Sequence, residues 1–143
     1  FERSCRVPLI LCAPGAGGGQ VCRSLVEFVD LYPTVADYCG LKAPHALAGR
    51  SLRPLLKDPA GKGREAAFTL VTRGGGQYGQ SVRTDRWRYT RWSDGAAELY
   101  DEQADPGETR NLAGQPEHVA VVKELAARLR ELPKPAPAAR PVK

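Results

Sequence analysis

The sequence predicts an α/β chain that becomes α+β toward its carboxy-terminal end. Three patterns support this fold class: a continuous apolar run at residues 6–13, short alternating runs at residues 66–100, and an amphipathic stripe at residues 116–132. Residues 1–65 are predicted to be the last strand–helix piece of a larger sheet. Residues 66–132 are predicted to form a small four-stranded antiparallel sheet with one long helix packed on it.

Two strands are expected in the first part of the chain. The apolar run from Arg6 to Ala13 is typical of a strand buried on both faces, as in a parallel sheet. Because proline donates no backbone hydrogen bond, we expect either that Pro8 lies at the start of this strand or that the strand lies at an edge of the sheet. A second, short strand is predicted at residues 25–29.

Two helices follow these strands. Asp30 is predicted to be the N-cap of a helix over residues 31–39, which Gly40 ends. A brief helix is predicted over residues 52–57, with Ser51 as its cap. The rest of residues 41–65 is expected to be a connection rich in glycine and proline.

The pattern changes after residue 65. Short apolar runs alternate with turn residues, which indicates an antiparallel meander with strands at residues 66–72, 80–84, 87–92 and 97–100. Pro116 then starts a helix that is predicted to reach Leu132 and to present one apolar stripe to the sheet. Residues 133–143 are predicted to be a disordered tail.

The bulk properties exclude little. The net charge of +5 arises from 21 Lys and Arg residues against 16 Asp and Glu residues. A modest positive field attracts nucleic acid, acidic glycans and sulfate esters alike. No apolar run approaches the roughly 20 residues that a membrane helix needs. The chain begins with Phe1 and contains no Met, which predicts a chain cut from a longer parent.

The cysteines are not spaced as a metal site. None of Cys5, Cys12, Cys22 and Cys39 belongs to a Cys-x-x-Cys pair, so no zinc site is expected. Cys12 and Cys39 lie in apolar runs and are predicted to be buried free thiols. A disulfide that involves Cys5 or Cys22 is left open.

Several short motifs occur in a fixed order along the chain. They are Arg6-Val7-Pro8-Leu9-Ile10, Val29-Asp30-Leu31-Tyr32-Pro33-Thr34, Gly49-Arg50-Ser51-Leu52, Arg88-Tyr89, Glu98-Leu99-Tyr100-Asp101, Asp105-Pro106, Glu108 and Asn111-Leu112-Ala113. In this order they resemble the carboxy-terminal part of the sulfatases, within the alkaline-phosphatase superfamily. The branch that they resemble most includes iduronate-2-sulfatase.

The resemblance implies a two-part enzyme that hydrolyses sulfate esters. The family uses a formylglycine made from the first residue of a Cys/Ser-x-Pro-x-Arg motif, and a calcium ion held by Asp-Asp and Asp-His or Asp-Asn pairs. This chain lacks such pairs, and Cys12-Ala13-Pro14 is followed by Gly15-Ala16 rather than by the required Arg. The resemblance therefore implies that calcium and formylglycine belong to an amino-terminal catalytic half upstream of Phe1. The fragment alone is predicted to be inactive.

Arg73 is the one substrate-binding candidate. An Arg occupies a similar place in the iduronate-2-sulfatase-like branch, and its planar fork suits a carboxylate or a sulfate. The alternative is a solvated loop residue. Residues 70–72 are Leu-Val-Thr, where the family commonly has Gln-Tyr-Pro.

An interleaved basic and aromatic stripe follows, with Arg83, Arg86, Arg88 and Arg91 among Trp87, Tyr89 and Trp92. Such a stripe could hold phosphates and stack bases, which would make the chain a self-standing module for anionic polymers. However, basic and aromatic residues fall on both faces of the strand, so cross-strand pairing is favoured and nucleic acid is not the expected partner.

The remaining polar candidates are interpreted as structural. Glu98, Asp101 and Asp105 lie at a strand end and an Asp-Pro turn, which favours backbone hydrogen bonding over acid–base chemistry. His45 and His118 are expected at the surface.

Overall fold

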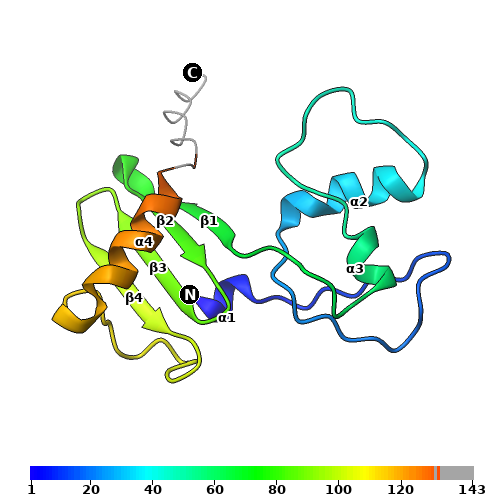
Figure 1. Ribbon diagram of the computed structural model, residues 1–143. Helices are drawn as coiled ribbons and strands as arrows, with labels where there is room; N and C mark the ends of the chain where they lie inside the picture. Colours follow the sequence, from blue (N-terminus) through cyan, green and yellow to red (C-terminus); the bar gives the residue numbers. More distant parts are fainter. Residues whose placement is uncertain (131, 133–143) are drawn as a thin grey trace, which may run out of the picture. The chain divides into compact units, whose positions relative to one another are not determined.

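The computed structural model describes residues 1–130 and 132. Within them the chain forms two compact units, shown in Figure 1. One unit comprises Val7–Ala67, and the other comprises Phe1–Arg6 together with the described residues from Phe68 onward. No helix in this part of the chain is long and apolar enough to cross a membrane. The domain limits expected at residues 65 and 132 stay predictions, and the predicted tail at residues 133–143 lies outside the described residues.

The sheet unit contains the predicted meander. Its strands are β1 (Ala67–Thr72), β2 (Tyr78–Arg83), β3 (Trp87–Trp92) and β4 (Ala97–Asp101), and they lie side by side in the order β1-β2-β3-β4. The pairs β2–β3 and β3–β4 are antiparallel. The predicted four-stranded sheet is thus confirmed. Its second strand begins at Tyr78, two residues earlier than expected.

One face of the sheet is covered by helix α4 (Val119–Leu129), which packs against β2 and β3 (Figure 1). The register places Val82, Tyr89 and Leu99 in one row across three strands. Val82 and Leu99 are fully buried there, as are Leu125 and Leu129 of α4. Each such side chain contributes roughly 1.5–3 kcal/mol through burial. The predicted helix is confirmed, although its first turn is the 3-10 helix η3 (Pro116–His118) and it ends at Leu129, before the predicted Leu132.

Two short helices flank the sheet strands in sequence. Helix α1 (Glu2–Cys5) belongs to the sheet unit, where Glu2 pairs with Arg83 and Arg88. The 3-10 helix η2 (Gly74–Gly76) forms the turn between β1 and β2, and Gly75 and Gly76 adopt positive φ there. Glycine suits this turn because side chains disfavour that conformation.

The second unit is built from η1 (Phe28–Asp30), α2 (Leu31–Tyr38) and α3 (Arg53–Lys57). The predicted helices over residues 31–39 and 52–57 are both confirmed. Asp30 does occupy the N-cap position of α2, but its side chain makes no capping hydrogen bond. Ser51 Oγ accepts the Arg53 amide hydrogen at 3.2 Å, immediately before α3.

The two strands predicted at residues 6–13 and 25–29 are not formed, so both predictions are wrong. Residues 6–13 form no strand, and at residues 25–29 only Leu25 makes a single antiparallel bridge, to Arg64. A strand needs a neighbour for its backbone N–H and C=O groups, and no strand of the described residues pairs with residues 6–13. The apolar side chains of this run are consequently exposed, Ile10 to 91%.

The prediction that Cys12 and Cys39 are buried is also wrong. All four are free and exposed, including Cys12 and Cys39, which were expected to be buried. Cys12 follows the unpaired apolar run, so no sheet covers it. Cys39 lies immediately after α2, beyond that helix's two buried positions, Thr34 and Ala36.

Candidate functional site

The motifs of the second unit bind one another. Thr34 Oγ1 donates to the carbonyl of Asp30 at 2.6 Å and accepts the Leu52 amide hydrogen at 2.9 Å. Ser51 Oγ donates to Asp37 Oδ2 at 2.6 Å. A Cβ atom on Gly49 would lie 1.8 Å from the Val29 carbonyl oxygen, so glycine is required there. These residues hold two chain segments together and leave no group free for chemistry.

Asp30 is the centre of this arrangement. Its carboxylate is fully buried and accepts the amide hydrogens of Glu27 at 2.9 Å and Arg50 at 2.8 Å. Arg64 donates to both carboxylate oxygens. Burial alone would raise the pKa of Asp30, but these hydrogen bonds hold it below its ordinary value. The carboxylate is therefore a buried structural anion whose charge Arg64 neutralises.

Three of the four Arg side chains of the basic stripe, those of Arg83, Arg86 and Arg88, form ion pairs within the sheet unit. Arg88 is 2% exposed and lies among the carboxylates of Glu2, Glu102 and Glu108. Its Nε is 2.7 Å from Glu108 Oε1, an ion pair whose angles do not fit a hydrogen bond. Although burial opposes it, these carboxylates raise the pKa of Arg88.

Arg86 is also occupied. It pairs with Asp101 at 2.7 Å and stacks 4.6 Å from the Trp87 ring centroid. Hydrogen bonding to Arg86 lowers the pKa of Asp101. Arg83, Arg86 and Arg88 therefore pair with carboxylates of the same unit and do not form a row of free cations for a polymer.

Asp101 and Asp105 have the predicted turn roles, whereas Glu98 does not, because its carboxylate accepts the indole N–H of Trp92. Asp101 Oδ1 accepts the amide hydrogens of Gln103 at 3.1 Å and Ala104 at 3.3 Å. Asp105 Oδ2 accepts those of Thr109 and Arg110, both at 2.8 Å, and these backbone bonds lower the pKa of Asp105.

Asn111 joins this turn to the sheet. Its Oδ1 accepts the amide hydrogen of Leu99 at 3.0 Å, and its Nδ2 donates to the Ala97 carbonyl at 3.1 Å. The Asn-Leu-Ala motif thus fastens the segment after the turn to strand β4.

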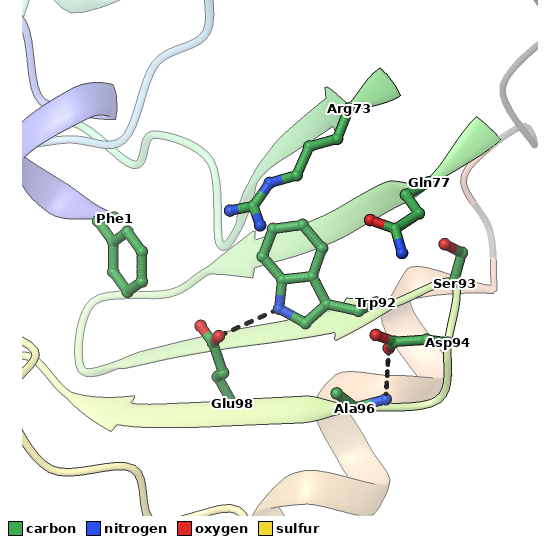
Figure 2. Close-up of a pocket in the computed structure, with 8 residues that line it drawn as sticks. All are labelled: Phe1, Arg73, Gln77, Trp92, Ser93, Asp94, Ala96 and Glu98. Atoms are coloured by element: carbon green, nitrogen blue, oxygen red, sulfur yellow. Dashed lines mark hydrogen bonds between the residues drawn. The ribbon is translucent and has the colours of Figure 1, made fainter. Parts of the chain in front are cut away.

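Arg73 lies at a shallow pocket of about 250 Å³ on the sheet unit, shown in Figure 2. The pocket is lined by Phe1, Arg73, Gln77, Trp92, Ser93, Asp94, Ala96 and Glu98. These residues come from the first residue of the chain, from the β1–β2 and β3–β4 turns, and from the strands next to those turns. In Figure 2 the side chains of Trp92 and Glu98 project from the sheet face opposite α4.

Trp92 is the centre of this pocket. The Arg73 guanidinium carbon lies 4.3 Å from the centroid of the Trp92 ring. Trp92 Nε1 donates to Glu98 Oε1 at 3.1 Å, and Asp94 Oδ1 accepts the Ala96 amide hydrogen at 2.9 Å (Figure 2). A free cation stacked on an aromatic ring, beside fixed carboxylates that can accept hydroxyl hydrogens, is suited to binding an anionic, hydroxyl-rich ligand.

The sequence indicated Arg73 but missed Trp92, Glu98 and Gly79 as its neighbours. The available signal was the meander itself, because a β2–β3 hairpin register sets Gly79 opposite Trp92. A glycine opposite a tryptophan leaves room for the ring to lie across the neighbouring strand.

Residues 1–130 and 132 contain no candidate metal centre. Within them, no cluster of three or more His, Cys, Asp or Glu side chains is arranged to hold a metal ion. The Glu2, Glu102 and Glu108 carboxylates do not fit calcium, because each already forms an ion pair with Arg83 or Arg88.

The histidines play no such role either. His45 is exposed, and His118 packs against the edge of Trp87 with ring centroids 5.5 Å apart.

Comparison with known proteins finds a family match over most of the chain. The sequence family described as "N-sulphoglucosamine sulphohydrolase, C-terminal" matches residues 1–135. Arylsulfatase K of Homo sapiens is 34% identical over 124 residues, which are 79% of this chain and 23% of that protein.

Two solved structures share the fold. A 2-O GAG sulfatase matches with 32% identity and a TM-score of 0.64, covering 71% of this chain and 23% of its own. A protein solved with its substrate D-glucosamine-2-N,6-O-disulfate matches with 28% identity and a TM-score of 0.64. This match covers 71% of the present chain and 22% of the solved chain. The chain thus spans about a quarter of the length of these relatives.

Proposed function

This chain belongs to the sulfatase family, and from that membership we propose that it is the carboxy-terminal part of an enzyme that hydrolyses sulfate esters. In this proposal the chain completes the fold and the substrate pocket, and catalysis takes place in an amino-terminal part. The structural observation that supports it best is the Arg73 pocket, which offers a cation for binding an anionic substrate.

The formylglycine and the calcium ion of the family would be held by that amino-terminal part. Cys12 lacks the required following Arg. The carboxylate clusters among the described residues are already paired with Arg64, Arg83, Arg86 and Arg88. The residues of this chain would therefore bind and orient the substrate, and would neither generate the nucleophile nor hold the ion.

An exposed apolar stripe supports a partner of this kind. Phe28, Tyr32 and Val35 follow one another at helical spacing along η1 and α2, and they are 69%, 58% and 62% exposed. A stripe like this needs a covering surface. We propose that the amino-terminal catalytic part of the sulfatase covers it.

For the substrate we propose a sulfated glycan, and for the chain a place in the iduronate-2-sulfatase-like branch. The motif order and the position of Arg73 support the branch. The likeness to a 2-O GAG sulfatase, at 32% identity, supports a sulfate on a glycan of that class. A uronic acid would also present a carboxylate to the Arg73 fork.

A chimaera tests this function. This chain would replace the segment that it matches in human arylsulfatase K, and sulfate release from a 2-O-sulfated uronic-acid disaccharide would be measured. We expect turnover, and we expect its loss when Tyr32 and Val35 are both changed to Glu. Val119→Glu, at an equally exposed valine of α4, is the matched control. A folded chimaera that binds the disaccharide but releases no sulfate would count against the proposal.

A further inference from the structure

We propose that Trp92 is a positioning residue that holds Arg73 as a preformed binding site for an anionic substituent of a glycan, either a carboxylate or a sulfate. This inference rests on the proposed function, because it assigns the group that the pocket would receive. It goes beyond that function by assigning supporting roles to Trp92, Gly79 and Glu98, none of which would contact the ligand.

The indole ring is fixed on one face and at its N–H. A Cβ atom on Gly79 would lie 2.8 Å from the Trp92 ring, so the ring lies directly on the backbone of strand β2. The Glu98 carboxylate accepts the indole N–H at 3.1 Å and sets the in-plane orientation of the ring. Any larger residue at position 79 would push the ring outward.

Arg73 occupies the other face of the indole. Its guanidinium carbon is 4.3 Å from the ring centroid, within the range of a cation–π contact. The Arg73 amide also donates to the Gln77 carbonyl at 2.7 Å, which ties its backbone across the η2 turn. Stacking on a fixed ring restricts a side chain that would otherwise have many rotamers.

The stacked guanidinium keeps its hydrogen-bond donors available. In the described part of the chain, the Arg73 side chain donates no hydrogen bond and forms no ion pair. The two carboxylates of the pocket are engaged elsewhere: Glu98 with Trp92 and Asp94 with the Ala96 amide. Stacking uses the face of the guanidinium and leaves its N–H edges for a bidentate oxygen pair.

Anion binding follows from this arrangement. Arg73 is the only Arg or Lys among the residues that line the pocket, and the pocket volume of about 250 Å³ leaves room beside it. The entropic cost of ordering Arg73 has been met before the ligand arrives, which is how preorganised sites gain affinity. Trp92 therefore affects affinity through Arg73, without a contact of its own to the ligand.

The experiment measures binding and requires no turnover. In the Trp87→Phe chain, Trp92 is the sole tryptophan, so its fluorescence reports directly on the pocket. The probe is an unsaturated 2-O-sulfated uronic-acid–glucosamine disaccharide. Its non-sulfated form and its carboxyl methyl ester are the two comparison probes, and they distinguish recognition of the sulfate from recognition of the carboxylate.

We expect saturable, salt-sensitive quenching of Trp92, with Arg73→Gln weakening binding by about tenfold or more. Calorimetry on Trp92→Leu should show affinity weakened by about 3- to 10-fold, while Trp92→Phe should recover most of it. Urea unfolding of each variant separates a loss of affinity from a loss of fold.

Two results would overturn the inference. The first is a folded Trp92→Leu chain with unchanged affinity, because a purely structural tryptophan would affect stability alone. The second is a folded parent chain that binds none of the three probes. Neither result bears on sulfatase membership, whereas an inactive chimaera with intact Arg73-dependent binding would count against the proposed turnover and leave this site standing.

Discussion

The Thr34 hydroxyl accepts the Leu52 amide hydrogen at 2.9 Å while it donates to the Asp30 carbonyl at 2.6 Å. This buried contact joins two of the sequence motifs that carry the sulfatase resemblance. The motifs are therefore bound to each other within the second unit, and the family pattern there records how the chain folds more than how it reacts.

Thr34→Val should destabilise the chain by about 1–3 kcal/mol, because the buried Leu52 amide loses its acceptor. Thr34→Ser keeps the hydroxyl and should cost less. Hydrogen exchange of the Leu52 amide, together with urea unfolding, provides the measurement. Equal protection of that amide in the Val and Ser variants would contradict the assigned role.

The Asp30–Arg64 pair predicts a pH dependence. The folded pKa of Asp30 is depressed below its ordinary value of 3.8, so the stabilisation it provides is fully present above that value. It is lost as the pH falls through the folded pKa, when the carboxylate protonates. The free energy of unfolding should therefore decline on acidification below about pH 4, and less steeply in Asp30→Asn. Parallel pH profiles for the two proteins would disprove this assignment.

Gly49→Ala should prevent normal packing of the second unit, because the added methyl would lie 1.8 Å from the Val29 carbonyl oxygen. Backbone atoms cannot move aside cheaply, so we expect a loss of several kcal/mol or more. Gly18→Ala is the control, since nothing lies within 4 Å of its Cβ position. The comparison needs thermal unfolding of both variants; equal midpoints would show that the clash is relieved.

Arg88→Ala should cost about 3–5 kcal/mol, because three buried carboxylates would lose their main cation. Arg91 lies on the same strand and forms no ion pair among the described residues. Arg91→Ala should therefore change the free energy of unfolding by roughly 0.5 kcal/mol at most. Urea unfolding measures both. If Arg88→Ala instead stayed fully stable and lost binding to heparin, the polymer-binding alternative would regain support.

The sequence predicted those elements whose apolar period is completed within this chain. The four strands and α4 bury Val82, Leu99, Leu125 and Leu129 against one another, so their patterns are satisfied locally. The apolar run at residues 6–13 has the pattern of a buried strand but no pairing partner among the described residues. An apolar pattern indicates that a segment is suited to burial, but it does not show whether the chain contains a strand that pairs with it.

The candidate site was only partly visible in the sequence. Arg73 was indicated by resemblance, whereas its platform depends on a cross-strand register that sets Gly79 opposite Trp92. Glu98 was interpreted as a turn residue, yet its carboxylate accepts the indole N–H. Contacts between strands depend on register, and a one-residue change of register would send these side chains to opposite faces.

The central claim is that this chain binds substrate and leaves the chemistry to another part of the enzyme. Sulfate released from the 2-O-sulfated disaccharide by the purified chain, with calcium present, tests this most directly. We predict no release above the blank, both for the parent chain and for Cys12→Ala. Clear sulfate release by the parent chain that Cys12→Ala abolishes would contradict the account.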